Sequence, residues 1–99
     1  MRLSIYVFAL LALTFSNPMT ARAYAPDIFQ VCGLDPIGDN FLALRAGPGA
    51  SYRLLERLGP GTVVMDWERR GAWFRVSVGD LNGREGWVYA SYLCLIEDH

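Results

Sequence analysis

Lysine is absent from this 99-residue sequence, and its nine basic residues are all arginines. The arginines are scattered, and Arg69 and Arg70 are the only adjacent pair. A protein that binds nucleic acid or an anionic membrane surface normally carries its basic residues in a cluster or stripe. The sequence therefore predicts no nucleic-acid binding.

Histidine is almost as scarce, because the one histidine is His99, at the C-terminal end. A serine or cysteine nucleophile needs a base within hydrogen-bond reach, and histidine is the usual base. Neither a C-x-x-C motif nor a cluster of histidines is present to bind a metal. Gly47-Pro48-Gly49 lacks the Lys-Ser/Thr pair of a phosphate-binding loop. We therefore expect no enzyme activity, no metal and no cofactor.

Long apolar runs are confined to the N-terminus, where Leu3 to Phe15 follows Arg2. Small residues then appear in Ala21-Arg22-Ala23, and this order is typical of a cleaved secretory signal peptide over residues 1–23. Cleavage after Ala25 also fits the pattern. The alternative is an uncleaved membrane anchor, but a span needs about 20 apolar residues, more than this run provides.

We therefore expect a periplasmic or secreted domain over residues 24–99, with no stable membrane anchor after cleavage. Loss of Arg2 and Arg22 leaves 7 basic and 10 acidic residues, a net charge of −3. Cys32 and Cys94 both fall in this domain, near its two ends. An oxidising compartment permits a disulfide, and a small exported domain often needs one because its core buries limited apolar area. We expect a Cys32–Cys94 disulfide, and the alternative is a pair of buried, unpaired thiols.

The domain alternates short apolar runs with glycine-rich turns and shows no helical period. The expected strands are Phe29–Cys32, Phe41–Arg45, Thr62–Glu68, Trp73–Val78, Glu85–Tyr89 and Leu93–Ile96, with Arg53–Leu58 as a strand or an irregular turn and Ala90–Tyr92 as one tight helical turn. Asn82-Gly83 indicates a hairpin, since a type I′ turn has a positive φ at both central residues. The loop around it, Gly79 to Arg84, is longer than a two-residue turn. The pattern predicts a small all-β barrel with a core over about residues 29–96. Closing such a barrel brings its first and last strands together, and Cys32 near Cys94.

Four motifs, in this order, resemble the bacterial SH3 (SH3b) domain family. They are Leu42–Tyr52 (LALRAGPGASY), Gly61–Val64 (GTVV), Gly71–Val76 (GAWFRV), and Gly86–Val88 (GWV) followed by Ser91–Leu93 (SYL). The resemblance implies an SH3-like β-barrel of five to seven short strands without catalytic activity. It also implies a role similar to the modules that target cell-wall hydrolases to peptidoglycan or its peptides. Ala43 and Leu44 depart from the family pattern, which usually has Asn and Val there.

Aromatic side chains are the candidate ligand-binding residues. Tyr52, Trp73 and Tyr92 lie at or beside expected loops, where flat amphipathic rings can hold a peptide or a sugar face. The alternative is that they only cover the mouth of the barrel. Trp67 is a fourth candidate, because neighbouring charged residues offer polar specificity; we nevertheless expect those residues to form a solvated loop. Trp87, in an expected strand, is predicted to pack in the core.

The sequence as a whole predicts an exported, non-catalytic binding module for peptidoglycan, a stem peptide or an envelope protein. The alternative is a protein that binds or inhibits a protein partner of the envelope through the same SH3-like surface.

Overall fold

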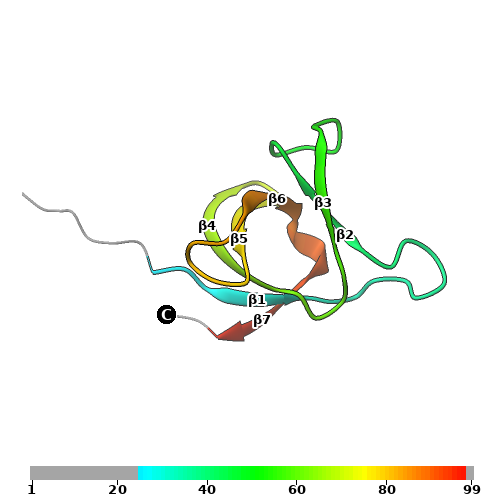
Figure 1. Cartoon of the computed structure of the whole chain (residues 1–99), viewed down its shortest axis with the longest axis horizontal. Coiled ribbons are helices and arrows are strands. Elements are labelled where there is room, and N and C mark those ends of the chain that lie inside the picture. Colours follow the sequence, from blue (N-terminus) through cyan, green and yellow to red (C-terminus); the bar gives the residue numbers. More distant parts are fainter. Residues whose placement is uncertain (1–24, 98–99) are drawn as a thin grey trace, which may run out of the picture.

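The computed structural model describes residues 25–97 (Figure 1), so the expected signal peptide and His99 lie outside the described part. The strands are β1 (Ile28–Val31), β2 (Leu42–Arg45), β3 (Leu54–Leu58), β4 (Val63–Arg70), β5 (Trp73–Val78), β6 (Glu85–Tyr89) and β7 (Leu93–Glu97), and the 3-10 helix η2 (Ala90–Tyr92) precedes β7. They form one sheet in the order β3-β2-β6-β5-β4-β1-β7. Over the described residues, no helix is long and apolar enough to cross a membrane.

All the strand pairs are antiparallel, and the sheet rolls up with its first and last strands side by side (Figure 1). The first strand, β1, lies between β4 and the last strand, β7. In the β1–β7 pair, Gln30 faces Cys94 and Val31 faces Leu93. The expected all-β, SH3-like barrel is therefore confirmed, with seven strands.

The core lies on the inner face of the rolled sheet. It consists of Phe29, Val31, Leu42, Leu44, Leu58, Val64, Val76, Val78 and Val88. On β2 the side chains alternate, with Leu42 and Leu44 buried and Ala43 and Arg45 partly exposed, as the two-residue period of a strand requires. This alternation puts Ala43 and Arg45 on the outer face of the sheet. Trp87 is buried at 8% exposure, as predicted.

The strand β5 is covered on both faces, which its alternating sequence does not indicate. Val76 and Val78 face the core, yet Ser77 between them is also fully buried. The indole of Trp67 explains this burial, because its Nε1 donates a hydrogen bond of 2.9 Å to the Ser77 Oγ. A tertiary contact between neighbouring strands therefore covers a residue that the sequence places on the solvent side.

The β5–β6 hairpin forms as expected through the loop from Gly79 to Arg84, without the type I′ geometry that Asn82-Gly83 favours. Gly79 has a positive φ of 89°, whereas the φ of Gly83 is not positive. Asp80 organises the turn, since its Oδ1 accepts a bond from the Asn82 N–H and its carbonyl accepts one from the Gly83 N–H. Such Asx turns are a common alternative to the type I′ geometry. Gly83 is needed for close approach, because a Cβ there would collide with the Val78 carbonyl.

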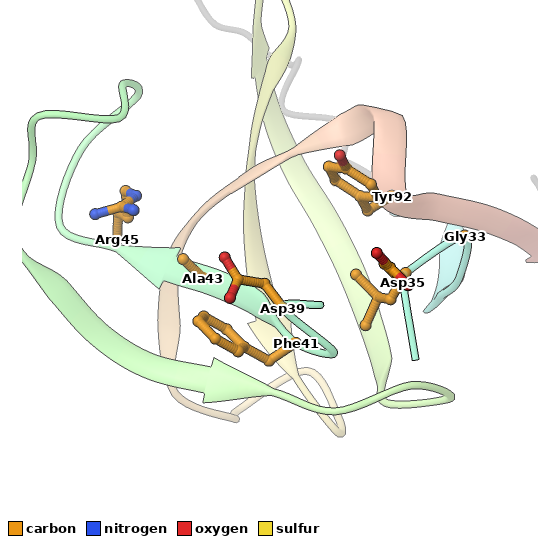
Figure 2. Close-up of a pocket in the computed structure, with 8 residues that line it drawn as sticks. Gly33, Asp35, Asp39, Phe41, Ala43, Arg45 and Tyr92 are labelled. Carbon is orange, nitrogen blue, oxygen red and sulfur yellow. The ribbon is translucent and has the colours of Figure 1, made fainter. Parts of the chain in front are cut away.

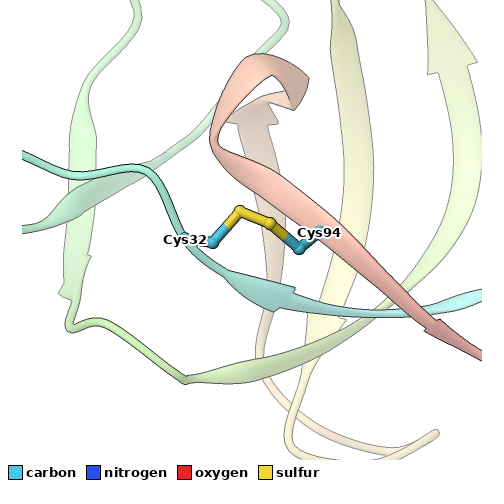
Figure 3. Close-up of a disulfide and its surroundings, with 2 residues drawn as sticks. All are labelled: Cys32 and Cys94. Carbon is cyan, nitrogen blue, oxygen red and sulfur yellow. A yellow bond between two sulfur atoms is a disulfide. The ribbon is translucent and has the colours of Figure 1, made fainter.

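Cys32 and Cys94 are joined in a disulfide that links the end of β1 to β7 (Figure 3), with the two Cα atoms 5.9 Å apart. A backbone hydrogen bond of 2.9 Å from the Cys32 N–H to the Tyr92 carbonyl lies beside it. The two ends of the domain are therefore held together by a covalent bond as well as by strand pairing.

A Cys32→Ser/Cys94→Ser double variant tests the contribution of this crosslink. The bond closes a sequence separation of 62 residues, so chain entropy predicts a loss of about 4 kcal/mol in the free energy of unfolding. Chemical denaturation measures this loss, and reduction of the wild-type protein serves as the control with the same expected effect. Intact-mass analysis that finds two free thiols in the oxidised protein would contradict the crosslink itself.

A buried charge holds the N-terminal lead-in to β4. Asp66 is fully buried, and its Oδ2 accepts a hydrogen bond from the Arg69 Nε while its Oδ1 accepts one of 2.8 Å from the Asp27 N–H. Arg69 also pairs with the Asp27 carboxylate at 2.9 Å, and its guanidinium lies 4.5 Å from the centre of the Phe74 ring. The expectation of a solvated charged loop around Trp67 is therefore wrong for Asp66, because β4 continues through this stretch to Arg70.

Arg69→Ala is expected to lower the free energy of unfolding by about 2–4 kcal/mol, because it leaves the buried Asp66 carboxylate without its guanidinium. Arg53→Ala is the matched control, since Arg53 is exposed and takes part in no ion pair among residues 25–97. It should change stability by less than about 0.5 kcal/mol. Urea denaturation compares the two, and equal losses would exclude a special role for Arg69.

Candidate functional site

The Gly-Pro-Gly loop after β2 is closed by Tyr52. Its ring lies directly over Gly47, where an added Cβ would overlap the ring atoms. The Arg45 Nη1 donates a hydrogen bond of 3.0 Å to the Tyr52 carbonyl, and the Ala46 N–H donates one of 2.9 Å to the Arg53 carbonyl. These bonds hold the two ends of the loop together. The Tyr52 side chain is 48% exposed, and it acts as a cover for the loop.

A pocket of about 340 Å³ opens beside this loop, on the outer face of β2 (Figure 2). Its lining residues are Gly33, Leu34, Asp35 and Asp39 from the β1–β2 loop, Phe41, Ala43 and Arg45 on or next to β2, and Tyr92 from η2. Two aromatic rings therefore share one cavity with three charged side chains. The volume lies at the lower end of the range for small-ligand pockets, roughly 300–1,000 Å³.

The charged residues of the pocket differ from most of those elsewhere on the sheet. Outside the pocket, Arg69, Arg70, Arg75 and Arg84 all pair with carboxylates. Hydrogen bonds from Arg75 and Arg70 lower the pKa of Glu68, and the hydrogen bond from Arg84 lowers the pKa of Glu56. Within residues 25–97, by contrast, no ion pair includes a charged side chain of the pocket.

A row of aromatic rings leads away from the pocket along the edge formed by β5, β6 and η2. Trp73 faces Tyr89 across the β5–β6 pair, with ring centroids 5.4 Å apart, and Tyr89 contacts Tyr92 at 6.1 Å. Tyr89 and Tyr92 are 39% and 38% exposed. Because Tyr92 belongs to both features, the row and the pocket form one continuous surface.

The structure brings together two of the four predicted site residues. Tyr92 lines the pocket, and Trp73 reaches it through Tyr89. Tyr52 contributes only its carbonyl to the hydrogen bond of Arg45, and Trp67 covers Ser77. The ligand-binding role of all four stays a prediction, and this geometry favours Tyr92 and Trp73.

Sequence reasoning missed the pocket residues Asp35, Asp39, Phe41 and Arg45. In the sequence, the two aspartates are typical turn formers within GLDPIGDN, and Arg45 is only the last residue of an expected strand. A signal was nevertheless present, since a polar outer position on β2 next to a long loop is a common place for a binding residue. No group of three or more His, Cys, Asp or Glu side chains in the described part of the chain is suited to hold a metal ion.

A model of the bacterial SH3 domain matches residues 40–93, more than half of the chain. The chain belongs to the bacterial SH3 domain family. Domains of this family often bind cell-wall or protein partners. A search of curated proteins found no match.

The matched segment contains only part of what this SH3 domain uses to build its pocket. Phe41, Ala43, Arg45 and Tyr92 fall inside it, whereas the acidic loop from Gly33 to Asp39 precedes it. Both cysteines of the disulfide also lie outside it, one on each side. The pocket is therefore built from residues of the matched segment and from the β1–β2 loop that precedes it.

Gly47→Ala tests the closure of the Gly-Pro-Gly loop by Tyr52. The added methyl group displaces the Tyr52 ring, so we expect a loss of about 1–3 kcal/mol in the free energy of unfolding and shifted Tyr52 resonances in the NMR spectrum. Gly49→Ala is the matched control, because its Cβ would lie 3.3 Å from the same ring and needs only a small adjustment. If both variants were as stable as the wild type, Tyr52 would not be held against Gly47.

Proposed function

We propose that this SH3 domain is an exported, non-catalytic binding module whose pocket and aromatic row hold a peptide of the cell envelope, with peptidoglycan as the first candidate. The observation that carries the proposal is the continuous surface of Tyr92, Tyr89 and Trp73 beside the pocket. Exposed aromatic rings next to a polar cavity are a frequent arrangement in sites that bind peptides and sugars.

Export to the periplasm or outside the cell is supported by two independent features. The sequence of residues 1–23 is typical of a secretory signal peptide. The Cys32–Cys94 disulfide favours an oxidising compartment, because cytosolic thiols are normally kept reduced. A domain in that compartment has access to the peptides of the cell wall.

The absence of enzyme activity is part of the proposal. The one histidine of the sequence is His99, outside the part that the structure describes. The cysteine sulfurs are joined to each other and offer no thiolate nucleophile. The pocket provides carboxylates, a guanidinium and a phenol, which is a set suited to recognition through charge and hydrogen bonds.

A protein partner is the second candidate, and one observation favours it. Ile37, at the tip of the loop that lines the pocket, is 96% exposed, and Leu95 and Ile96 on the edge strand β7 are at least half exposed. Large apolar side chains in such positions are common at protein interfaces. A partner or inhibitor protein would contact the loop tip in addition to the pocket.

Sedimentation with purified peptidoglycan tests the first candidate. Wild-type protein should be retained in the pellet, and Tyr92→Ala and Trp73→Ala should each weaken retention by about tenfold, because they remove rings at the centre of the surface. Leu81→Ala is the control, since Leu81 is also a large, exposed apolar residue, 55% exposed, but lies in the β5–β6 loop outside the pocket and the aromatic row. Absence of wild-type retention at every salt concentration would exclude peptidoglycan.

A further inference from the structure

The three charged side chains at the pocket retain hydrogen-bonding capacity. Arg45 uses its Nη1 for the Tyr52 carbonyl, and a guanidinium has five N–H donors. Asp35 accepts one bond of 3.0 Å from the Ile37 N–H through its Oδ1. Asp39 is exposed, and its carboxylate takes part in no ion pair among residues 25–97.

Positive and negative charges are separated across the pocket. In Figure 2, Asp35 and Tyr92 lie at one end of the cavity and Arg45 at the other, with Asp39 and Phe41 between them. This arrangement suits a ligand that carries an ammonium and a carboxylate at a short distance from each other. Arginine binds carboxylates through paired hydrogen bonds, and an ammonium can donate to both aspartates.

The walls of the pocket are held in place before any ligand arrives. Cys32, directly before the acidic loop, is bonded to Cys94, and its N–H donates to the carbonyl of Tyr92. Within the loop, the Gly38 N–H donates a bond of 3.1 Å to the Asp35 carbonyl. A site that is already ordered loses less conformational entropy on binding.

We propose that the pocket selects a dipolar residue of a peptide, whose ammonium binds at Asp35 and Asp39 and whose carboxylate binds at Arg45. The hydrocarbon part of that residue lies over Phe41 and Tyr92. This inference rests on the proposed function and narrows its ligand to a stem peptide that ends in a diamino acid. Asp35 and Asp39 lie in the β1–β2 loop, before the segment that the family model matches, so this loop supplies the acidic side of the selectivity.

Three synthetic tripeptides test the proposal by calorimetric titration of the oxidised wild-type protein. The first is alanyl-γ-glutamyl-lysine with an acetylated N-terminus, so that the lysine side chain carries its one ammonium. The second is acetylated on that side chain, and the third has a C-terminal amide. Each change removes one charge-assisted hydrogen-bond partner, so the dissociation constant should rise by about tenfold in both cases. Equal affinity for all three peptides would overturn the proposal.

Two variants assign each charge to its partner. In Arg45→Gln, amidation should have almost no further effect, while acetylation should still weaken binding by about tenfold. In Asp39→Asn, amidation should still weaken binding by about tenfold, while acetylation should have a smaller effect than in the wild type. Some effect of acetylation should persist, because Asp35 can still bind the ammonium. If a protein substitution cancels the effect of one peptide modification on affinity, the two groups are direct partners. If the effects of substitution and modification on binding free energy simply add in both variants, the assignment is overturned.

Arg53→Gln is the matched control, because Arg53 is an exposed arginine outside the pocket, and it should bind the three peptides as the wild type does. The modified peptides leave the protein intact, so the test does not depend on the stability of any variant. Sedimentation with peptidoglycan but no difference between the peptides would overturn this inference and leave the proposed function standing. If the protein neither sediments with peptidoglycan nor distinguishes the peptides, both this inference and the proposed function are overturned.

Discussion

The pairing of β1 with β7, covalently secured by Cys32 and Cys94, is the constraint on which the rest of the structure depends. A domain of this size buries limited apolar area, and β7 joins the sheet only through its pairing with β1. The same closure brings the β1–β2 loop beside η2, since Cys32 donates a hydrogen bond to Tyr92. The fold and the pocket therefore share one physical cause.

The pocket is formed where the segment matched by the family meets the β1–β2 loop that precedes it. The family segment supplies Arg45 and two aromatic rings, and the preceding loop supplies the acidic side. A loop of this kind can change the lining of a pocket without any change to the core, because surface loops tolerate variation that a packed core does not. The disulfide, whose cysteines also lie outside the matched segment, holds the start of the β1–β2 loop in position.

The charged side chains of the domain fall into two sets, those that are paired with each other and those that are in no ion pair. Asp66 and Arg69 join the N-terminal lead-in to β4, and Glu68 is held between two arginines. Those groups are already paired, so a ligand would have to displace an existing partner. Asp39 and Arg45 form no ion pair within the described residues, so a ligand would not have to displace a charged partner from them.

The sequence by itself determined the strands β5 and β6 to the residue, the hairpin between them and the disulfide partners, because alternation, turn residues and compartment are local or compositional signals. The sequence also identified the family, because the motifs that resemble bacterial SH3 domains lie in the strands and turns of the barrel. Only the tertiary structure decided that Trp67 covers Ser77, that Asp66 is buried, and that residues far apart in the sequence meet at one pocket. These features arise from the rolling and closure of the sheet, and a strand's own pattern does not record which distant residue will lie against it.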